Sequence, residues 1–400
     1  MRLLHPLLFL ALAGTPLALR AAEAASPARS ATTDIPESVI YLQNPSAGGL
    51  TVSFLTRREV ANVVVEYAVA GQATARQPAV AMPVPQTAWT MWKARLEKLE
   101  PGTSYRYVVR YDQGGTAGSE PARTFRTLDP KAKSVRFLAV NDLHHKVETL
   151  AAAMKRVRPE DFEFSVLLGD MLEGPADGAA VLKAWTGYMQ LLGAAQKPIL
   201  FVRGNHDTRQ AFAKKLACLI DLPNLDAKAP WGEDQWQFTL RAGPVWFVAL
   251  DTGEDDTQNT AENSYKNPKL WRRVRDREAE WLHQVAVRQE WAEARWRVFL
   301  SHIPLYDNNE WWCHDGRPKW EPILKDIAPD VMLAGHDHGW KLLPQTAAQP
   351  WPVLIGGGPS LEEATIMLVT ADESALQARL LAAKDGTLLT EFKKSATVRP

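Results

Sequence analysis

The sequence has little cysteine and no excess of charge of either sign. Cys218 and Cys313 are its 2 cysteines among 400 residues, and Lys plus Arg equal Asp plus Glu at 46 each. Two cysteines this far apart do not form a zinc motif. A balanced charge without a basic run gives no signature of nucleic-acid or anionic-membrane binding. Spacing cannot show whether the cysteines pair, and we favour two free thiols.

Long apolar runs are also scarce, and the one at the N-terminus is short and broken. Met1-Arg2 is followed by an apolar stretch over 7–19, which Gly14 and Pro16 interrupt. Ala22-Glu23-Ala24 then fits the small-x-small rule for signal cleavage. We therefore predict a signal peptide at 1–24 and export to a bacterial periplasm or out of the cell. An uncleaved anchor is the alternative, and no further membrane span is expected.

The first part of the mature chain has the pattern of a small β-domain. A linker rich in Ala, Ser, Thr and Pro covers 25–36, and short alternating runs then fill 37–128. Pro101-Gly102 makes a turn before Tyr105 and Tyr107, which share one strand face. This Leu-x-Pro-Gly-Thr-x-Tyr-x-Tyr pattern resembles a fibronectin type III domain, a β-sandwich. It shows no catalytic constellation, so we interpret it as a structural or positioning module.

From 134 to 400 the pattern changes to strands alternating with helices, which indicates an α/β domain. Helices are expected at 147–157, 179–192, 210–219 and 268–290, and loops at 251–266 and 308–314. Strands are expected at 135–140, 164–168, 198–202, 236–240, 245–250, 297–300 and 331–334, with a strand-rich end at 364–392.

Polar side chains with metal-ligand chemistry follow five of the buried strands. Carboxyl ends of parallel strands meet at one sheet edge, where open α/β sheets place their sites. Carboxylate, imidazole and amide oxygen without thiolate suit Mn, Fe, Zn or Co. The ligands are too many for one ion, so two ions sharing a carboxylate fit better. The segments are Asn141-Asp142-Leu143-His144-His145, Gly169-Asp170, Arg203-Gly204-Asn205-His206-Asp207, Ser301-His302 and Gly335-His336-Asp337-His338.

These motifs, in this order, resemble those of the calcineurin-like metallophosphoesterases over about 135–340. The preceding sandwich and the run from His302 to Tyr306 are similar to the purple acid phosphatases of that superfamily. The resemblance implies an N-terminal β-sandwich followed by an αββα sandwich with a dinuclear site at the strand ends. Two departures are Glu173, where purple enzymes have Tyr, and His144 in the first motif. We therefore expect no Fe(III)-phenolate centre, and the two ions stay open among Mn, Fe and Zn.

The resemblance also implies a role for each motif residue. His206 would donate a proton, and Asp207 would orient it or stand behind it. Arg203, His145 and Tyr306 are candidates for substrate binding. A substrate wall could consist of Trp311, Trp312, Tyr306 and His314, or the Trp pair could cap the core, and both interpretations stay open. Asp142, His144, Asp170 and His338 would hold one metal, with Asp170 shared, and Asn205, His302 and His336 would complete the second.

The function predicted from these residues is a secreted metallophosphoesterase in which a metal-bound hydroxide attacks a phosphate ester. Monoesters are favoured as substrates. A phosphodiesterase of the same fold is the alternative, and a weakly catalytic binding or adhesion module is a second one. The oligomeric state is left open.

Overall fold

The structure is a computed structural model that describes residues 36–226, 228–229, 233–255, 264–306 and 311–397. The predicted signal peptide and nearly all of the predicted linker lie outside these ranges, as do parts of both predicted loops. Within the described residues, no helix is both long enough and apolar enough to cross a membrane.

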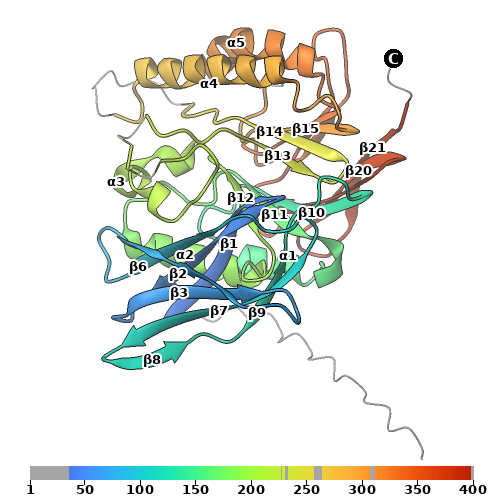
Figure 1. Ribbon diagram of the computed structural model, residues 1–400. Helices are drawn as coiled ribbons and strands as arrows, with labels where there is room; N and C mark the ends of the chain where they lie inside the picture. Colours follow the sequence, from blue (N-terminus) through green and yellow to red (C-terminus); the bar gives the residue numbers. More distant parts are fainter. Residues whose placement is uncertain (1–35, 227, 230–232, 256–263, 307–310, 398–400) are drawn as a thin grey trace, which may run out of the picture.

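A large mixed sheet forms the centre of the fold (Figure 1). β10, β11 and β12 run parallel in its middle, and every residue of β11 is buried. Burial on both faces explains why these strands read as continuous apolar runs. In spatial order the strands are β21 (Leu388–Ser395), β20 (Ala375–Ala382), β19 (Thr365–Asp372), β10 (Ser134–Val140), β11 (Phe164–Leu168), β12 (Ile199–Val202), β1 (Ser38–Ser46), β2 (Gly49–Thr56), β6 (Thr90–Leu96) and β5 (Val80–Pro83).

A second, six-stranded sheet packs against the first. Phe247 of this sheet lies with its ring centroid 5.1 Å from that of Phe137 and 6.0 Å from that of Phe164. α4 (Pro268–Arg288) and α5 (Trp311–Ile327) cover one outer face, and α1 (Val147–Met154) and α2 (Gly178–Leu191) cover the other (Figure 1). The predicted αββα sandwich is therefore confirmed. The strand order is β13 (Phe238–Ala242), β14 (Val245–Ala249), β15 (Trp296–Leu300), β16 (Val331–Ala334), β18 (Val353–Ile355) and β17 (Lys341–Leu343).

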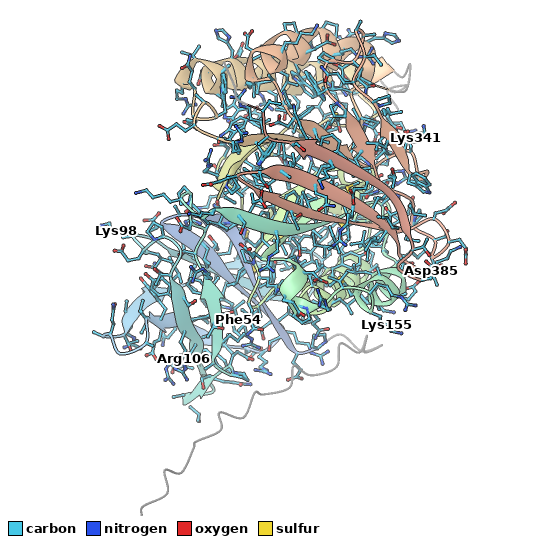
Figure 2. The ribbon with its side chains drawn as sticks, turned by 90° about the vertical axis from the view of Figure 1, so that its right-hand side faces the viewer. Phe54, Lys98, Arg106, Lys155, Lys341 and Asp385 are labelled. Atoms are coloured by element: carbon cyan, nitrogen blue, oxygen red, sulfur yellow. The ribbon has the colours of Figure 1, made fainter. Side chains whose placement is uncertain are left out.

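The predicted N-terminal β-sandwich is also present, and one of its sheets is part of the large sheet. Phe54 of β2, labelled in Figure 2, stacks on Tyr111 of the facing sheet with ring centroids 5.7 Å apart. β1 pairs in parallel with β12 through Gln43 and Ile199, which the sequence did not indicate. Residues 127–133, between the predicted domains, hold no helix or strand. The facing sheet contains β4 (Ala75–Pro78), β3 (Ala61–Ala68), β7 (Ser104–Gln113), β8 (Thr116–Ser119) and β9 (Arg123–Arg126).

Two local predictions were wrong. The helix predicted over 210–219 is broken into α3 (Gln210–Ala213) and a 3₁₀ turn, Leu216–Cys218. Residues 311–314, predicted as loop, begin α5. Pro318 and Pro322 lie inside that helix and make its sequence unlike a helix. Its buried apolar face, which includes Trp320, packs on the second sheet and outweighs the two prolines.

Cys218 is a free, buried thiol. Burial raises its pKa to about 12. The side chain of Cys313 lies outside the described part of the chain.

Candidate metal centre

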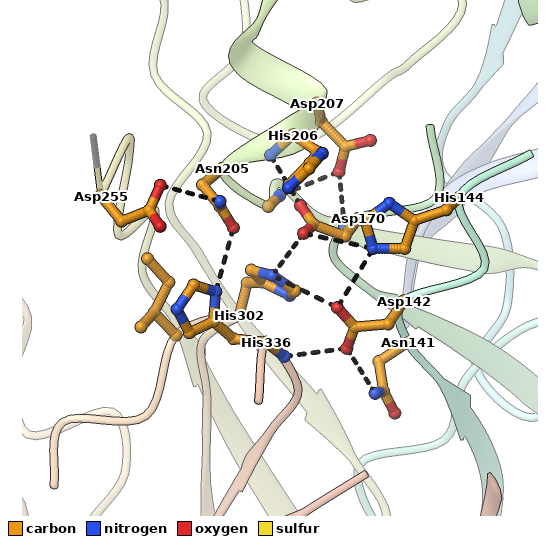
Figure 3. A network of polar contacts seen from close by, with 12 residues as sticks. Asn141, Asp142, His144, Asp170, Asn205, His206, Asp207, Asp255, His302 and His336 are labelled. Carbon is orange, nitrogen blue, oxygen red and sulfur yellow. Dashed lines mark hydrogen bonds and ion pairs between the residues drawn. The ribbon is translucent and has the colours of Figure 1, made fainter. Parts of the chain in front are cut away.

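Polar side chains that follow five strands of the two sheets gather in one place. Figure 3 shows most of them as a single network. β10, β11 and β12 of the large sheet supply the residues from Asn141 to His206, and β15 and β16 of the second sheet supply the rest. Among the described residues, three groups have one ligand atom per residue within 4.8 Å of the others. One group joins His144 and His206 to Glu173, and the other two, the clusters, consist of strand-end residues alone. The clusters are Asp142, His144 and His338, and Asp170, His302 and His336.

Asp142 uses one carboxylate oxygen for the protein and leaves the other facing the cluster. Oδ2 accepts hydrogen bonds from Asn141 Nδ2 at 2.6 Å and from His336 N at 2.8 Å. Oδ1 is buried, has no hydrogen-bond donor among the described residues, and lies 3.4 Å from His338 Nε2 and 3.6 Å from His144 Nε2. This is the arrangement of a carboxylate ligand held from behind.

Asp170 lies between the two clusters. Its Oδ1 accepts a hydrogen bond from His206 N at 2.8 Å. Its Oδ2 lies 3.1 Å from His302 Nε2 and 3.7 Å from His144 Nε2, so it faces one imidazole of each cluster. A carboxylate in this place can be shared by two ions.

The surroundings of His302 show how neighbouring charges shift the pKa values of side chains in the site. Its Nδ1 donates to the Leu168 carbonyl at 3.0 Å, which leaves Nε2 directed at the carboxylates. Burial alone would lower the pKa of His302, but Asp170 and Asp142 raise it to about 10. Burial would raise the pKa of each of these two carboxyls, but His302 together with other polar neighbours more than offsets it, so both pKa values lie below their usual range.

Asn205 is oriented by a residue that the sequence analysis did not single out. Its Nδ2 donates to Asp255 Oδ1 at 2.9 Å, so its Oδ1 faces His336 Nδ1 at 3.2 Å. Figure 3 shows Asp255 on the far side of Asn205 from the clusters. By binding the amide nitrogen, Asp255 turns the amide oxygen of Asn205, its ligand atom, toward the clusters. Its position inside a predicted loop gave no signal for this role.

His206 is held between two charged side chains. Arg209 Nη1 donates to His206 Nε2 at 2.8 Å, and Glu173 Oε1 lies 3.0 Å from His206 Nδ1. Arg209 is itself fixed by a bidentate pair with buried Glu254 at 2.7 and 2.9 Å. Arg209 was missed because it lies beyond the motif, although a cation four residues after the strand-end Asn was visible in the sequence.

Asp207 binds backbone N–H groups and not the His206 ring, so the first of its two predicted roles, orienting His206, is wrong. Its side chain is fully buried, and its oxygens accept backbone N–H bonds from Asp170 at 2.9 Å, Gly204 at 2.9 Å and Leu172 at 3.0 Å. Burial, and then Asp170, raise the pKa of Asp207 to about 7. Asp207 thereby connects the segment after β11 to the segment after β12 through hydrogen bonds.

Arg203 does not face the site, and the prediction that it contacts phosphate is wrong. It is 1% exposed, and its guanidinium donates to Asp251 at 2.9 Å and to Asp234 at 3.4 Å. Two carboxylates already satisfy this cation, and the Trp236 ring lies 4.6 Å from it.

Tyr306 is part of the core rather than the predicted substrate wall. It is 4% exposed, and its ring packs against Trp351 with centroids 5.8 Å apart. The side chains of Trp311 and Trp312 lie outside the described residues. His145 is half-buried next to His144, and its contact with phosphate stays a prediction.

The backbone at the site is left-handed at residues other than glycine. The φ angles are 51° at Asp142, 43° at His144, 52° at Asp170, 77° at His336 and 56° at His338. Each such residue costs about 1–2 kcal/mol, and such residues cluster at functional sites. The strand-end turns are therefore shaped for the side chains they present.

Glycines make room for these side chains. A Cβ at Gly335 would overlap Asp142 Oδ2, and one at Gly204 would overlap Asp170 Oδ1. The run Gly356-Gly357-Gly358 after β18 forms a wall behind the site, where Asn141 Nδ2 donates to the Gly357 carbonyl at 2.8 Å. This run was missed, although three glycines after an apolar strand are a signal for close approach.

The residues present fit two transition-metal ions. Two ligands about 2.1 Å from one ion lie roughly 3 to 3.4 Å apart. His144 and His338 bring their Nε2 atoms to 3.0 Å, and His302 Nε2 lies 3.1 Å from Asp170 Oδ2. Two buried carboxylates without a full set of donors also require positive charge nearby.

Comparison with known proteins identifies the family. The calcineurin-like phosphoesterase family model matches residues 135–340, the stretch that carries all five motifs. The chain belongs to the calcineurin-like phosphoesterase family. It is therefore a phosphoric ester hydrolase that depends on metal, and the family implies a dinuclear site and a phosphate-ester substrate.

Solved structures show how far the calcineurin-like fold extends in this chain. A purple acid phosphatase from yellow lupin (Lupinus luteus) seeds matches 90% of this chain and 74% of its own, with 13% identity and a TM-score of 0.70. Protein TT1561 of Thermus thermophilus matches 66% of this chain and 99% of its own, with 15% identity and a TM-score of 0.37. The first likeness shows a shared fold over both parts of the chain. No curated protein matches the sequence.

Proposed function

We propose that this phosphoesterase is an exported phosphatase that hydrolyses phosphate monoesters at a dinuclear centre. The observation that carries the proposal is the pair of ligand clusters that meet at Asp170 Oδ2, 3.1 Å from His302 Nε2 and 3.7 Å from His144 Nε2. The centre reaches solvent at His338, whose side chain is 42% exposed, so a substrate can approach there. The N-terminal apolar run and its small-x-small motif support export.

In this proposal, the ligand side chains are divided between two metal ions. Asp142, His144 and His338 would hold one ion, His302, His336 and Asn205 the other, and Asp170 both. When bound, two such cations lower the pKa of water, so that hydroxide exists near neutral pH, and they neutralise phosphate oxygens.

His206 would carry the proton that the leaving alcohol needs. Its ring lies beside the His144 cluster, with centroids 4.6 Å apart, and the side chain is 21% exposed. A positioned imidazole of this kind contributes about 10²–10⁴-fold to a rate as general acid. Arg209 and Glu173 restrict its rotation from opposite sides.

The test is hydrolysis of an aryl monoester and an aryl diester by the mature protein, loaded separately with Mn, Fe and Zn. Asp170→Asn serves as the control. We expect metal-dependent turnover that the control abolishes and a higher kcat/KM for the monoester. A higher value for the diester would replace the monoesterase proposal with the phosphodiesterase. Two tightly bound ions without turnover on either ester would favour the binding-module alternative.

A further inference from the structure

Glu173 places one carboxylate against two imidazole rings of the centre. Its Oε2 accepts a hydrogen bond from His144 Nδ1. Its Oε1 lies 3.0 Å from His206 Nδ1, at hydrogen-bond distance but not aligned as a hydrogen bond. One side chain therefore contacts both a proposed metal ligand and the proposed proton donor.

The backbone that carries Glu173 is fixed on both sides of the site. Leu172 N donates to Asp207 Oδ1 at 3.0 Å, and His144 N donates to the Asp170 carbonyl at 3.0 Å. Glu173 thus starts from a turn that is already fastened to the turn of His144. Its side chain is 56% exposed, so packing does not explain its orientation. The two imidazoles are the polar partners that the structure records for its carboxylate.

The contact with His144 determines which nitrogen faces the centre. A carboxylate only accepts hydrogen bonds, so His144 Nδ1 carries the hydrogen and Nε2 keeps its lone pair. That Nε2 lies 3.0 Å from His338 Nε2 and 3.6 Å from Asp142 Oδ1. A carboxylate behind a histidine ligand orients the ring and makes it a better donor to the metal.

The contact with His206 means that this ring has a charged partner at each of its two nitrogens. Arg209 holds Nε2 at 2.8 Å, and Glu173 stands at Nδ1. Without Glu173 the ring would be held on one side alone. The orientation of the His206 ring would then be less well defined.

We propose that Glu173 is a positioning residue that fixes the rings of His144 and His206 with one carboxylate and so keeps His144 Nε2 directed at the metal site. The inference rests on the proposed function and deepens it. Glu173 contacts His144, which belongs to only one of the two clusters. The proposal therefore predicts that the loss of Glu173 weakens the binding of one metal ion and not of the other.

The first test is a titration of metal-free protein with Co²⁺, followed by visible absorption and calorimetry. We expect Glu173→Ala to weaken one of the two binding steps by about 10–100-fold and to leave the other unchanged. Glu173→Gln keeps an acceptor oxygen for His144 and should recover most of that loss. Glu160→Ala, which removes an exposed glutamate from a surface pair with Arg158, is the matched control and should bind as wild type.

The second test separates the two contacts by kinetics at saturating metal. Glu173→Ala should lower kcat by about 10-fold at constant KM, and it should have no further effect in a His206→Ala background. Unchanged binding steps and unchanged kcat would overturn the proposal. Loss of both binding steps together with a lower melting temperature would also overturn it, because Glu173 would then only support the fold.

Failure of the proposed function gives a different result. A wild-type protein that binds two ions but hydrolyses no ester would overturn that function, while the shifted binding step in Glu173→Ala would still show how His144 is positioned. A wild-type protein that binds no metal would overturn the centre and the role of Glu173 together.

Discussion

Three of the side chains proposed as ligands, Asp142, His302 and Asn205, use their two polar atoms in the same way. One atom is fixed by the protein and the other faces the clusters. Asp142 is held through Oδ2 by Asn141, and His302 is held through Nδ1 by the Leu168 carbonyl. Asn205 is held through its amide nitrogen by Asp255. Supporting partners of this kind set the direction of a ligand before any ion arrives, which lowers the cost of ordering the site on binding.

The proton-donor role of His206 is testable by substitution. His206→Ala should keep both ions and lose about 10²–10⁴-fold in kcat, because the general acid is removed and the ligands are not. Metal content by mass spectrometry and turnover of an alkyl phosphate would be measured, with His283→Ala on exposed α4 surface as control. Near wild-type turnover of this poor leaving group would assign the proton to another donor.

Asp207 should matter for stability rather than for chemistry. Asp207→Ala leaves three buried N–H groups without their acceptor, and we expect the free energy of unfolding to fall by about 2–4 kcal/mol. Urea denaturation would measure this. Glu160→Ala, from a surface pair with the exposed Arg158, should change it by less than about 1 kcal/mol. A folded, equally stable variant with low kcat would return Asp207 to a catalytic role.

At the scale of elements, strands and their ends were predictable and contacts beyond them were not. The apolar run before Asn205 and the polar residues after it have short-range signatures, because burial and the strand end are both encoded locally. The partners of Arg203 and Asp207 depend on which segments fold against them, and sequence spacing does not contain that information. α5 was missed for a related reason, since Trp320 and its core partners outweigh Pro318 and Pro322.

The turn after β16 offers a paired test of the close approach by glycine. Gly335→Ala would press its Cβ on Asp142 Oδ2, whereas a Cβ at Gly339, in the same turn, would meet no atom nearer than 3.9 Å. We expect Gly335→Ala to weaken metal binding more than about 10-fold, and Gly339→Ala to stay near wild type. Calorimetric metal titration measures both. If Gly335→Ala bound metal as tightly as Gly339→Ala, the turn would have room for a Cβ next to Asp142 Oδ2.

The 3₁₀ turn that carries Cys218 should keep this thiol unreactive. Burial raises its pKa to about 12, so at pH 8 the thiol is protonated as well as shielded. In a Cys313→Ser background we expect reaction with a disulfide reagent to be at least ~100-fold slower in native protein than in urea. Rapid native labelling would mean that this segment opens readily.

At the scale of the whole molecule, the large sheet joins the sandwich to the catalytic part. Leu42 N donates to the Ala194 carbonyl at 2.9 Å, and Tyr107 Oη donates to the Ala195 carbonyl at 2.6 Å. Lys93 of β6 lies against the segment after α3, where its Nζ donates to the Ala217 carbonyl at 3.3 Å. These contacts join the two parts into one unit.

The joined sheet predicts a single unfolding transition. Urea curves followed by tryptophan fluorescence and by far-UV circular dichroism should coincide. Tyr41→Phe removes a buried 2.7 Å hydrogen bond from Tyr41 to the Leu219 carbonyl across the junction. It should lower the free energy of the one transition by about 1 kcal/mol without splitting it. Two separated transitions would show that the sandwich folds by itself.

The span of chain between ligands has a consequence for biosynthesis. His144 and His338 face each other across 194 positions of sequence, and His336 N reaches Asp142 across the same separation. A growing chain that has not yet made β16 lacks one imidazole of each cluster. The full ligand set of each cluster therefore exists only after both sheets have formed, so complete metal loading would report that the two sheets have come together.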